Sequence, residues 1–174
     1  CTCKGFCENK PEVKPDILIL GKALSGGVLP VSAVLADDEI MLCIKPGEHG
    51  STFGGNPLAC AVAMAALDVI RDERLDANAE KLGIIFRERI QKTIDKYPVA
   101  LLVRGKGLLN AIVVDDDEEG HLAWDMCVAM AEKGLLAKPT HGNIIRFAPP
   151  LVITEDQLHE CCDIIEEVIS TFSS

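Results

Sequence analysis

Aromatic side chains are scarce in this chain: one Trp, one Tyr and five Phe make up 4% of its 174 residues. The core must therefore be filled by aliphatic side chains, and a hydrophobic content of 48% supplies enough of them for a substantial one. No apolar run approaches the ~20 residues that a helix needs to cross a bilayer. This absence excludes a transmembrane helix and predicts that the protein has no membrane partner.

Basic residues are also in short supply. The chain has 17 Lys and Arg against 27 Asp and Glu, which gives a formal net charge of -10. An acidic chain repels the phosphate backbone of DNA and RNA, because both carry charge of the same sign. The composition therefore argues against nucleic acid as a partner.

The eight cysteines include no Cys-x-x-Cys pair. Cys1, Cys3 and Cys7 cluster at the N-terminus without a nearby histidine, so their spacing argues against zinc, although a zinc site stays the alternative interpretation. We expect no metal site and interpret the cysteines as reduced thiols of an intracellular protein. The remaining five are expected to act as small hydrophobic residues: Cys43, Cys60, Cys127, Cys161 and Cys162.

The first half of the chain has the pattern of an α/β protein. Residues 16–20 and 31–35 are predicted to be strands, and their continuous apolar character favours strands covered on both faces. Asn56 followed by Pro57 is typical of a helix start. The predicted inward face of this helix is formed by Leu58, Val62, Ala65 and Val69. A longer helix follows and ends at Pro98, with Leu75, Ala79, Leu82, Phe86, Ile90, Ile94 and Tyr97 on one face.

The second half predicts a small α+β domain. It contains a strand at residues 108–114, an acidic turn at 115–120, a helix at 122–133, and short strands at 135–138 and 144–148. Thr154 and Gln157 form a capping box for a last helix. Its predicted inward residues are Leu158, Cys161, Ile165, Val168 and Phe172. We expect two regions, residues 1–98 with a larger α/β layer and residues 99–174 as the small domain.

The segment "ILILGKALSGG" places Lys22 at the end of an apolar strand and between small residues. Most lysines at strand ends are solvated, but the slim backbone around Lys22 would let a bulky planar molecule approach its amine. Burial in such a pocket disfavours the charged form of a lysine. A neutral amine reacts with aldehydes, and pyridoxal phosphate is the aldehyde cofactor that uses such a lysine.

Two further segments carry candidate binding residues. Ser51 and Thr52 lie in the glycine-rich loop "GEHGSTFGG", which fits either an anion-binding cradle or an ordinary turn. Arg146 lies in the apolar segment "IIRFAPPL", where its stem can pack while its head reaches solvent. His49 and His141 are in neighbouring loops without metal-ligand spacing, so we expect them to be structural or exposed to solvent.

These segments resemble a known family. "DILILGKALSGG" followed by "PVSAVL" is similar to the cofactor-lysine segment of the class-III, fold-type-I aminotransferases. The segments "IKPGEHGSTFGGNPLA", "RGKGLLNAIV" and "LLAKPTHGNIIRFAPPLVIT" narrow the resemblance to the ornithine aminotransferase branch. The resemblance extends from about Val13 to the end of the chain.

The resemblance implies a fold, a cofactor and a set of roles. Residues 1–98 would be the end of the large cofactor-binding domain with its connecting helices, and residues 99–174 the small C-terminal domain. Lys22 would hold pyridoxal 5'-phosphate and move the proton during catalysis. Thr52, with Ser51 beside it, would reach the cofactor phosphate of the partner subunit in a homodimer or higher homo-oligomer. Arg146 would bind the carboxylate of the amino-acid or keto-acid substrate, because a planar guanidinium matches a carboxylate.

The implied reaction moves the δ-amino group of L-ornithine to 2-oxoglutarate, giving glutamate 5-semialdehyde and glutamate. The alternatives are a class-III enzyme acting on acetylornithine or 4-aminobutyrate, or an inactive homologue that serves as a binding protein. The chain begins with Cys1 and shows no signal peptide. We therefore expect the C-terminal part of a longer intracellular protein, cytoplasmic or in the mitochondrial matrix. The aspartate and the aromatic ring that the family uses to hold the cofactor ring are expected upstream.

Overall fold

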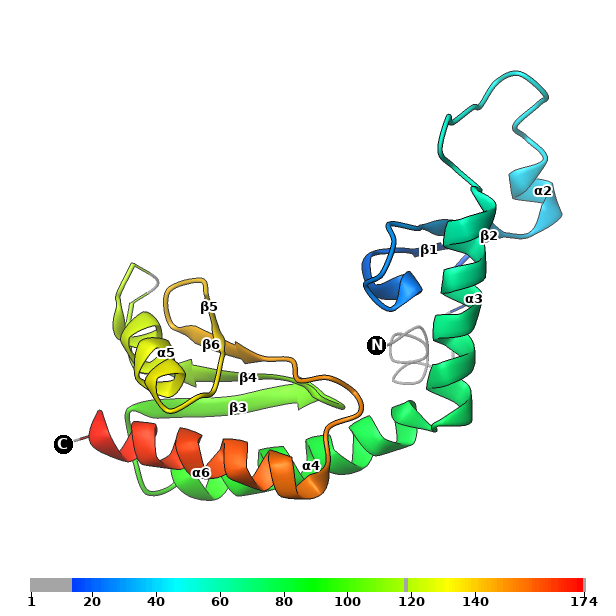
Figure 1. Cartoon of the computed structure of the whole chain (residues 1–174). Helices are drawn as coiled ribbons and strands as arrows, with labels where there is room; N and C mark the ends of the chain where they lie inside the picture. The colour runs from blue at the N-terminus through cyan, green and yellow to red at the C-terminus, as the bar shows by residue number, and fades with distance from the viewer. Residues whose placement is uncertain (1–13, 118, 174) are drawn as a thin grey trace. The chain divides into compact units, whose positions relative to one another are not determined.

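The computed structural model describes residues 14–117 and 119–173, so the cysteines at positions 1, 3 and 7 lie outside the described residues. The chain divides into two compact units, one ending at Arg74 and the other beginning at Leu75 (Figure 1). The first unit contains β1 (Ile17–Leu20), η1 (Lys22–Ser25), β2 (Ala33–Ala36), α2 (Asp38–Met41) and α3 (Pro57–Asp72). The second contains α4 (Leu75–Ile94), β3 (Ala100–Lys106), β4 (Leu109–Val114), α5 (Leu122–Glu132), β5 (Lys138–Thr140), β6 (Ile144–Phe147) and α6 (Glu155–Thr171).

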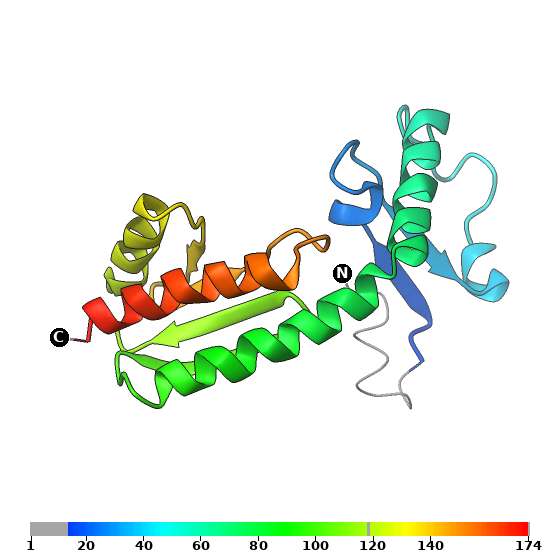
Figure 2. The ribbon, with the colours of Figure 1, turned by 60° about the horizontal axis from the view of Figure 1, so that its bottom comes forward.

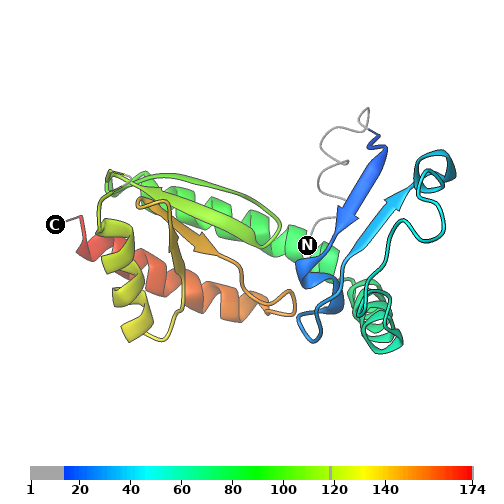
Figure 3. The same ribbon diagram turned by 90° about the horizontal axis from the view of Figure 1, so that it is seen from above.

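The first unit is built around a two-stranded sheet. β1 and β2 pair antiparallel, from Ile17 opposite Ala36 to Leu20 opposite Ala33, and Figure 3 shows them side by side. The prediction that both faces are covered is wrong for the described residues, because Ile19 is 74% exposed. The reason is that α3 packs against η1 rather than across the strands.

Helix α3 begins where the sequence predicts. The Asn56 side chain accepts a hydrogen bond from the Ala59 amide at 2.8 Å, and Pro57 occupies the first helical position. This arrangement satisfies one of the amides that have no partner within the helix at the start of α3.

The predicted inward face of α3 is wrong. Ala59 and Ala63 are buried, whereas Leu58 is 65% exposed. The helix lies so close to η1 that a Cβ added to Gly26 would lie 3.4 Å from the Cβ of Ala66. Small residues therefore face η1, and the larger apolar side chains that define the sequence pattern point outward.

The second unit contains a four-stranded antiparallel sheet in the order β3-β4-β6-β5. Helices α4 and α6 run alongside each other on the sheet, and α5 contacts β5, β6 and α6 (Figures 1 and 2). Strand β3 is not predicted from the sequence, because Arg104, Gly105 and Lys106 interrupt its apolar pattern. The strand predicted at residues 135–138 corresponds to β5, which begins only at Lys138 and ends at Thr140.

The hydrophobic core of the second unit joins all three helices to one face of the sheet. The predicted inward face of α4 is confirmed at Leu82, Phe86 and Ile90, which are at most 3% exposed. In α6 the capping box is confirmed, and Leu158, Ile165 and Val168 are buried as predicted. Two of the predicted inward residues of α6 are only partly buried, and their places are taken by Cys162 and Ile169, both 0% exposed.

The two compact units divide at a different place from the predicted boundary at residue 98. The apolar face of α4 packs against β3 and α6, so this helix belongs with the second unit. The assignment of residues 1–98 and 99–174 to two domains of the complete protein stays a prediction. No helix among the described residues combines the length and the apolar character that a membrane crossing needs.

Candidate functional site

Lys22 is the first residue of η1 and follows Gly21 at the end of β1. Its φ of 56° lies in the left-handed region, which residues with a side chain rarely adopt. Such a conformation costs about 1–3 kcal/mol and persists only where the surrounding structure imposes it. Strained residues of this kind are frequent at functional sites, so the backbone itself marks Lys22 as a candidate.

Ser25 fixes the other end of η1. Its side chain is 1% exposed, and it is the one buried polar side chain of the first unit among residues 14–74. The Ser25 hydroxyl donates to the Leu29 carbonyl, and its oxygen accepts from the Leu29 amide at 3.2 Å. Gly26 and Gly27 have φ of 67° and 86°, which lets the chain turn sharply between these bonds. Ser25 thus closes the loop that follows Lys22.

A cavity of about 600 Å³ opens beside Lys22. Its volume lies within the ~300–1,000 Å³ of ordinary small-molecule sites. The Lys22 amine has no hydrogen-bond or ion-pair partner among the described residues, so it is free to engage a ligand. The lining is otherwise made by two segments of the first unit, residues 27–32 and residues 53–56 with Ala59 and Cys60.

The loop with Ser51 and Thr52 leads directly into this lining. The Ser51 oxygen accepts a hydrogen bond from the Gly54 amide at 2.8 Å, which leaves its own proton available to a ligand. Thr52 is exposed, and its hydroxyl has no partner among the described residues. The cavity is lined from Phe53 onward, so the structure brings this loop near Lys22 without placing either hydroxyl in the lining.

Arg146 lies on β6 between two buried residues, Ile145 and Phe147. Its own side chain is exposed and has no ion-pair partner among the described residues. The guanidinium therefore points away from the core and can accept a planar anion. Arg146 belongs to the second unit, whereas Lys22, Ser51 and Thr52 belong to the first.

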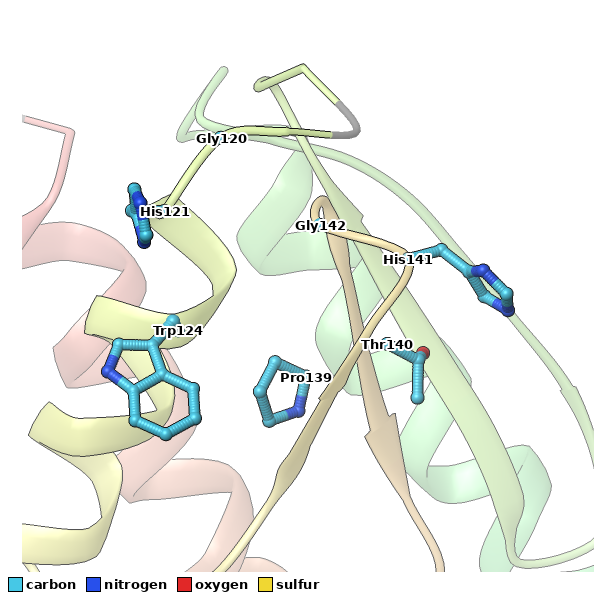
Figure 4. Close-up of a pocket in the computed structure, with 7 residues that line it drawn as sticks. All are labelled: Gly120, His121, Trp124, Pro139, Thr140, His141 and Gly142. Carbon is cyan, nitrogen blue, oxygen red and sulfur yellow. The ribbon is translucent and has the colours of Figure 1, made fainter.

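A second cavity, of about 320 Å³, lies in the second unit between α5 and β5 (Figure 4). Trp124 and Pro139 face it, while the rings of His121 and His141 point away from each other. His141 is exposed, as the sequence predicts. The described residues contain no group of three or more histidine, cysteine or carboxylate side chains that could hold a metal ion.

The acidic turn has a structural role that the sequence interpretation does not include. The Asp116 carboxylate accepts hydrogen bonds from the amides of Asp117 and Leu122, both at 2.8 Å. These bonds, with the Leu122 amide as the larger cause, lower the pKa of Asp116. Because Leu122 is the first residue of α5, the Asp116 carboxylate caps the N-terminus of this helix from the turn that precedes it.

The five described thiols differ in burial, and Cys161 is intermediate. Cys127 and Cys162 are buried, and burial raises their pKa to about 11 and about 12 respectively. They behave as the small hydrophobic residues that the sequence predicts. Cys43 and Cys60 are exposed, so for them that prediction is wrong. Cys60 lines the cavity beside Lys22, a position that no feature of the sequence indicates.

Comparison with known proteins identifies the class. A family model described as aminotransferase class-III matches residues 1–169, and the chain belongs to that family. The mitochondrial ornithine aminotransferase of Drosophila melanogaster is 61% identical over 97% of this chain and 38% of its own length. The mitochondrial ornithine aminotransferase of Rattus norvegicus is 58% identical over 98% of this chain and 38% of its own.

Solved structures give the same family and the same fold. An acetylornithine aminotransferase from Elizabethkingia anophelis is 65% identical, with a TM-score of 0.91, over 95% of this chain and 43% of that one. The ornithine delta-aminotransferase of Plasmodium falciparum is 47% identical, with a TM-score of 0.88, over 96% of this chain and 43% of that one. The predicted fold class, part of a fold-type-I class-III aminotransferase, is confirmed. The chain spans about two fifths of the length of the relatives that it matches.

Proposed function

We propose that the complete protein is a pyridoxal-phosphate-dependent ornithine aminotransferase. The observation that carries this proposal is Lys22, a strained lysine with a free amine beside a cavity of about 600 Å³, in a chain of the class-III family. Two curated relatives at 61% and 58% identity are named ornithine aminotransferases, which favours ornithine as the amino donor.

The residues around Lys22 fit the cofactor. Lys22 holds it through its amine, and the glycines at 27, 54 and 55 leave room for a planar ring. When bound, the cofactor supplies the electron sink that stabilises negative charge at the substrate carbon. The Lys22 amine then moves the proton as a general acid and base.

The loop at residues 51–52 contributes to phosphate binding in a homodimer. The free Thr52 hydroxyl, and the proton that Ser51 has left to donate, are suited to phosphate oxygens. Their absence from the lining beside Lys22 supports the expectation that they serve the partner subunit's cofactor. The proposed assembly is therefore a homodimer in which each subunit completes the other's site.

Arg146 is proposed to bind the carboxylate of the small-molecule substrates, L-ornithine or 2-oxoglutarate. The exposed guanidinium without a partner can form two parallel hydrogen bonds to a carboxylate. The retained lysine and arginine together argue against an inactive homologue. For location, the names of the Drosophila melanogaster and Rattus norvegicus relatives include the word mitochondrial, which favours the mitochondrion over the cytoplasm.

One observation favours a second candidate. The Elizabethkingia anophelis structure with 65% identity to this chain is an acetylornithine aminotransferase. Acetylornithine differs from ornithine at the α-amino group, so the residues that contact that group decide between the two donors.

The test uses the full-length protein loaded with pyridoxal phosphate and 2-oxoglutarate. Ornithine, acetylornithine and 4-aminobutyrate are offered as donors, and glutamate formation is followed. We expect the highest kcat/KM with ornithine and no measurable turnover in Lys22→Ala. A higher kcat/KM with acetylornithine than with ornithine would favour the second candidate. Turnover in Lys22→Ala would show that Lys22 is not required for catalysis.

A further inference from the structure

The cavity of about 320 Å³ between α5 and β5 is lined by the only tryptophan of the chain. Trp124 on α5 and Pro139 on β5 face this cavity (Figure 4). Trp124 is 58% exposed, and its indole N–H has no hydrogen-bond partner among residues 14–117 and 119–173. Tryptophan is enriched at binding surfaces because it offers a large apolar face and one polar donor. The core of the second unit does not include this ring, so the ring is available to a ligand.

The turn before α5 puts negative charge at the edge of this cavity. Residues 115–117 and Glu119 are acidic and have no ion-pair partner in the part of the chain that the structure describes. Gly120 lines the cavity and lies against the Asp116 carboxylate, because a Cβ added to Gly120 would overlap that group. The hydrogen bond from the Leu122 amide is the main reason that the pKa of Asp116 is lowered. This carboxylate therefore stays charged at neutral pH.

The rest of the lining does not balance that charge. Among the described residues, no lysine or arginine lines the cavity. The rings of His121 and His141 point away from each other (Figure 4). The Thr140 hydroxyl donates to the Ile144 carbonyl at 3.4 Å, so this donor is already used. What remains is the face of an indole ring with a carboxylate nearby, and both attract a cation.

The size of the cavity and the shape of its ring select among cations. A volume of about 320 Å³ lies at the lower end of the ~300–1,000 Å³ of small-molecule sites, so it suits a small head group. A guanidinium is planar, weakly hydrated and able to stack on an aromatic face, whereas an ammonium is compact and strongly hydrated. The indole of Trp124 therefore favours a guanidinium over an ammonium.

From this arrangement we propose that the cavity between α5 and β5 binds small molecules that carry a guanidinium group. The guanidinium stacks on Trp124 and directs its charge toward Asp116. The inference goes beyond the proposed function and does not depend on it. Every residue that it uses lies in the second unit, and none of them has a proposed role in binding the cofactor or the amino-acid and keto-acid substrates.

The test measures the binding of three probes to the full-length protein loaded with pyridoxal phosphate. Ethylguanidinium is the planar cation, ethylurea has the same planar shape without the charge, and propylammonium has the charge without the planar group. Ligand-observed NMR measures the affinities, because it detects weak binding. Circular dichroism checks that each variant is folded.

Two positions are varied, each with a conservative replacement. Trp124→Leu removes the aromatic face, and Trp124→Phe keeps a smaller one. Asp116→Asn removes the charge but keeps a side-chain oxygen that can accept the hydrogen bond from the Leu122 amide. The control is Glu88→Gln, which removes one negative charge from an exposed position on α4.

We expect ethylguanidinium to bind the parent protein more tightly than either of the other probes does. Trp124→Leu should weaken it by about two- to fivefold, as for a cation–π contact at an exposed site. Trp124→Phe should have a smaller effect. Asp116→Asn should weaken ethylguanidinium by a similar factor, as for an exposed ion pair. Glu88→Gln should leave the affinity unchanged, and ornithine turnover should be the same in all of these variants.

Several results would overturn the inference. The first is the absence of saturable ethylguanidinium binding, which would also follow if another part of the complete protein covered the cavity. The second is equal affinity for ethylurea and ethylguanidinium, because the cavity would then recognise shape and not charge. The third is an unchanged affinity in Trp124→Leu, or a loss in Glu88→Gln as large as that in Asp116→Asn. Tighter binding of an arginine-containing tripeptide than of ethylguanidinium would assign the cavity to a protein partner instead.

Discussion

Lys22 combines three properties that folding does not require: a left-handed backbone, a free amine and a position beside a cavity. The sequence predicts this residue because the signal comes from its neighbours along the chain, the apolar residues before it and the glycines after it. Ser25 and Cys60 are not predictable in the same way. Their importance depends on a loop closing onto Leu29 and on α3 lying against η1, and both are tertiary contacts.

The thiols allow a test at the residue scale. We expect iodoacetamide at pH 8 to label Cys43 and Cys60 rapidly, because both are exposed. Cys127 and Cys162 should be labelled only on unfolding, since burial raises their pKa to about 11 and about 12, and only the thiolate reacts. The measurement is mass spectrometry of the 174-residue chain with and without denaturant. Equal labelling of all four thiols in the folded chain would contradict the described packing.

At the scale of elements, the helices are more predictable than the strands. The capping box at Thr154 and the apolar period of α4 are local signals, and both are confirmed. Strand β3 is held by its ladder to β4, with a register irregularity near Leu102, and by contact with α4. These are long-range contacts, so its own residues do not predict it. The predicted inward face of α3 is wrong for a related reason. The helix packs so closely on η1 that small residues, and not large ones, face it.

Gly83 supports a prediction about how α4 packs. In an exposed helix, replacing Gly by Ala stabilises by about 0.5–1 kcal/mol. Here the added Cβ would lie 2.0 Å from the Gly107 carbonyl oxygen, so the helix and the β3–β4 turn must move apart. We expect Gly83→Ala to lower the free energy of unfolding by about 1–3 kcal/mol, the usual range for overpacking. Urea denaturation measures it.

The control for Gly83→Ala is Glu88→Ala on the same helix. Glu88 is exposed and has no ion-pair partner among the described residues, so its variant should lie within about 0.5 kcal/mol of the parent. A stabilising effect of Gly83→Ala would show that the backbones at residues 83 and 107 do not approach as described.

At the scale of the whole chain, the two units differ in how much they bury. Among the described residues, Ala59 and Ala63 are the only buried apolar side chains of the first unit. The second unit has a contiguous core that joins α4, α5 and α6 to the sheet. We expect residues 75–174, expressed alone, to unfold in one cooperative transition, observed by circular dichroism. A gradual, non-cooperative loss of signal would contradict an independent core.

Borohydride reduction determines which lysine holds the cofactor. The full-length protein is loaded with pyridoxal phosphate and reduced, and its peptides are mapped by mass spectrometry. We expect a pyridoxyl group on Lys22, the lysine that lines the cavity of about 600 Å³. A pyridoxyl group on Lys45 or Lys138 instead would contradict it.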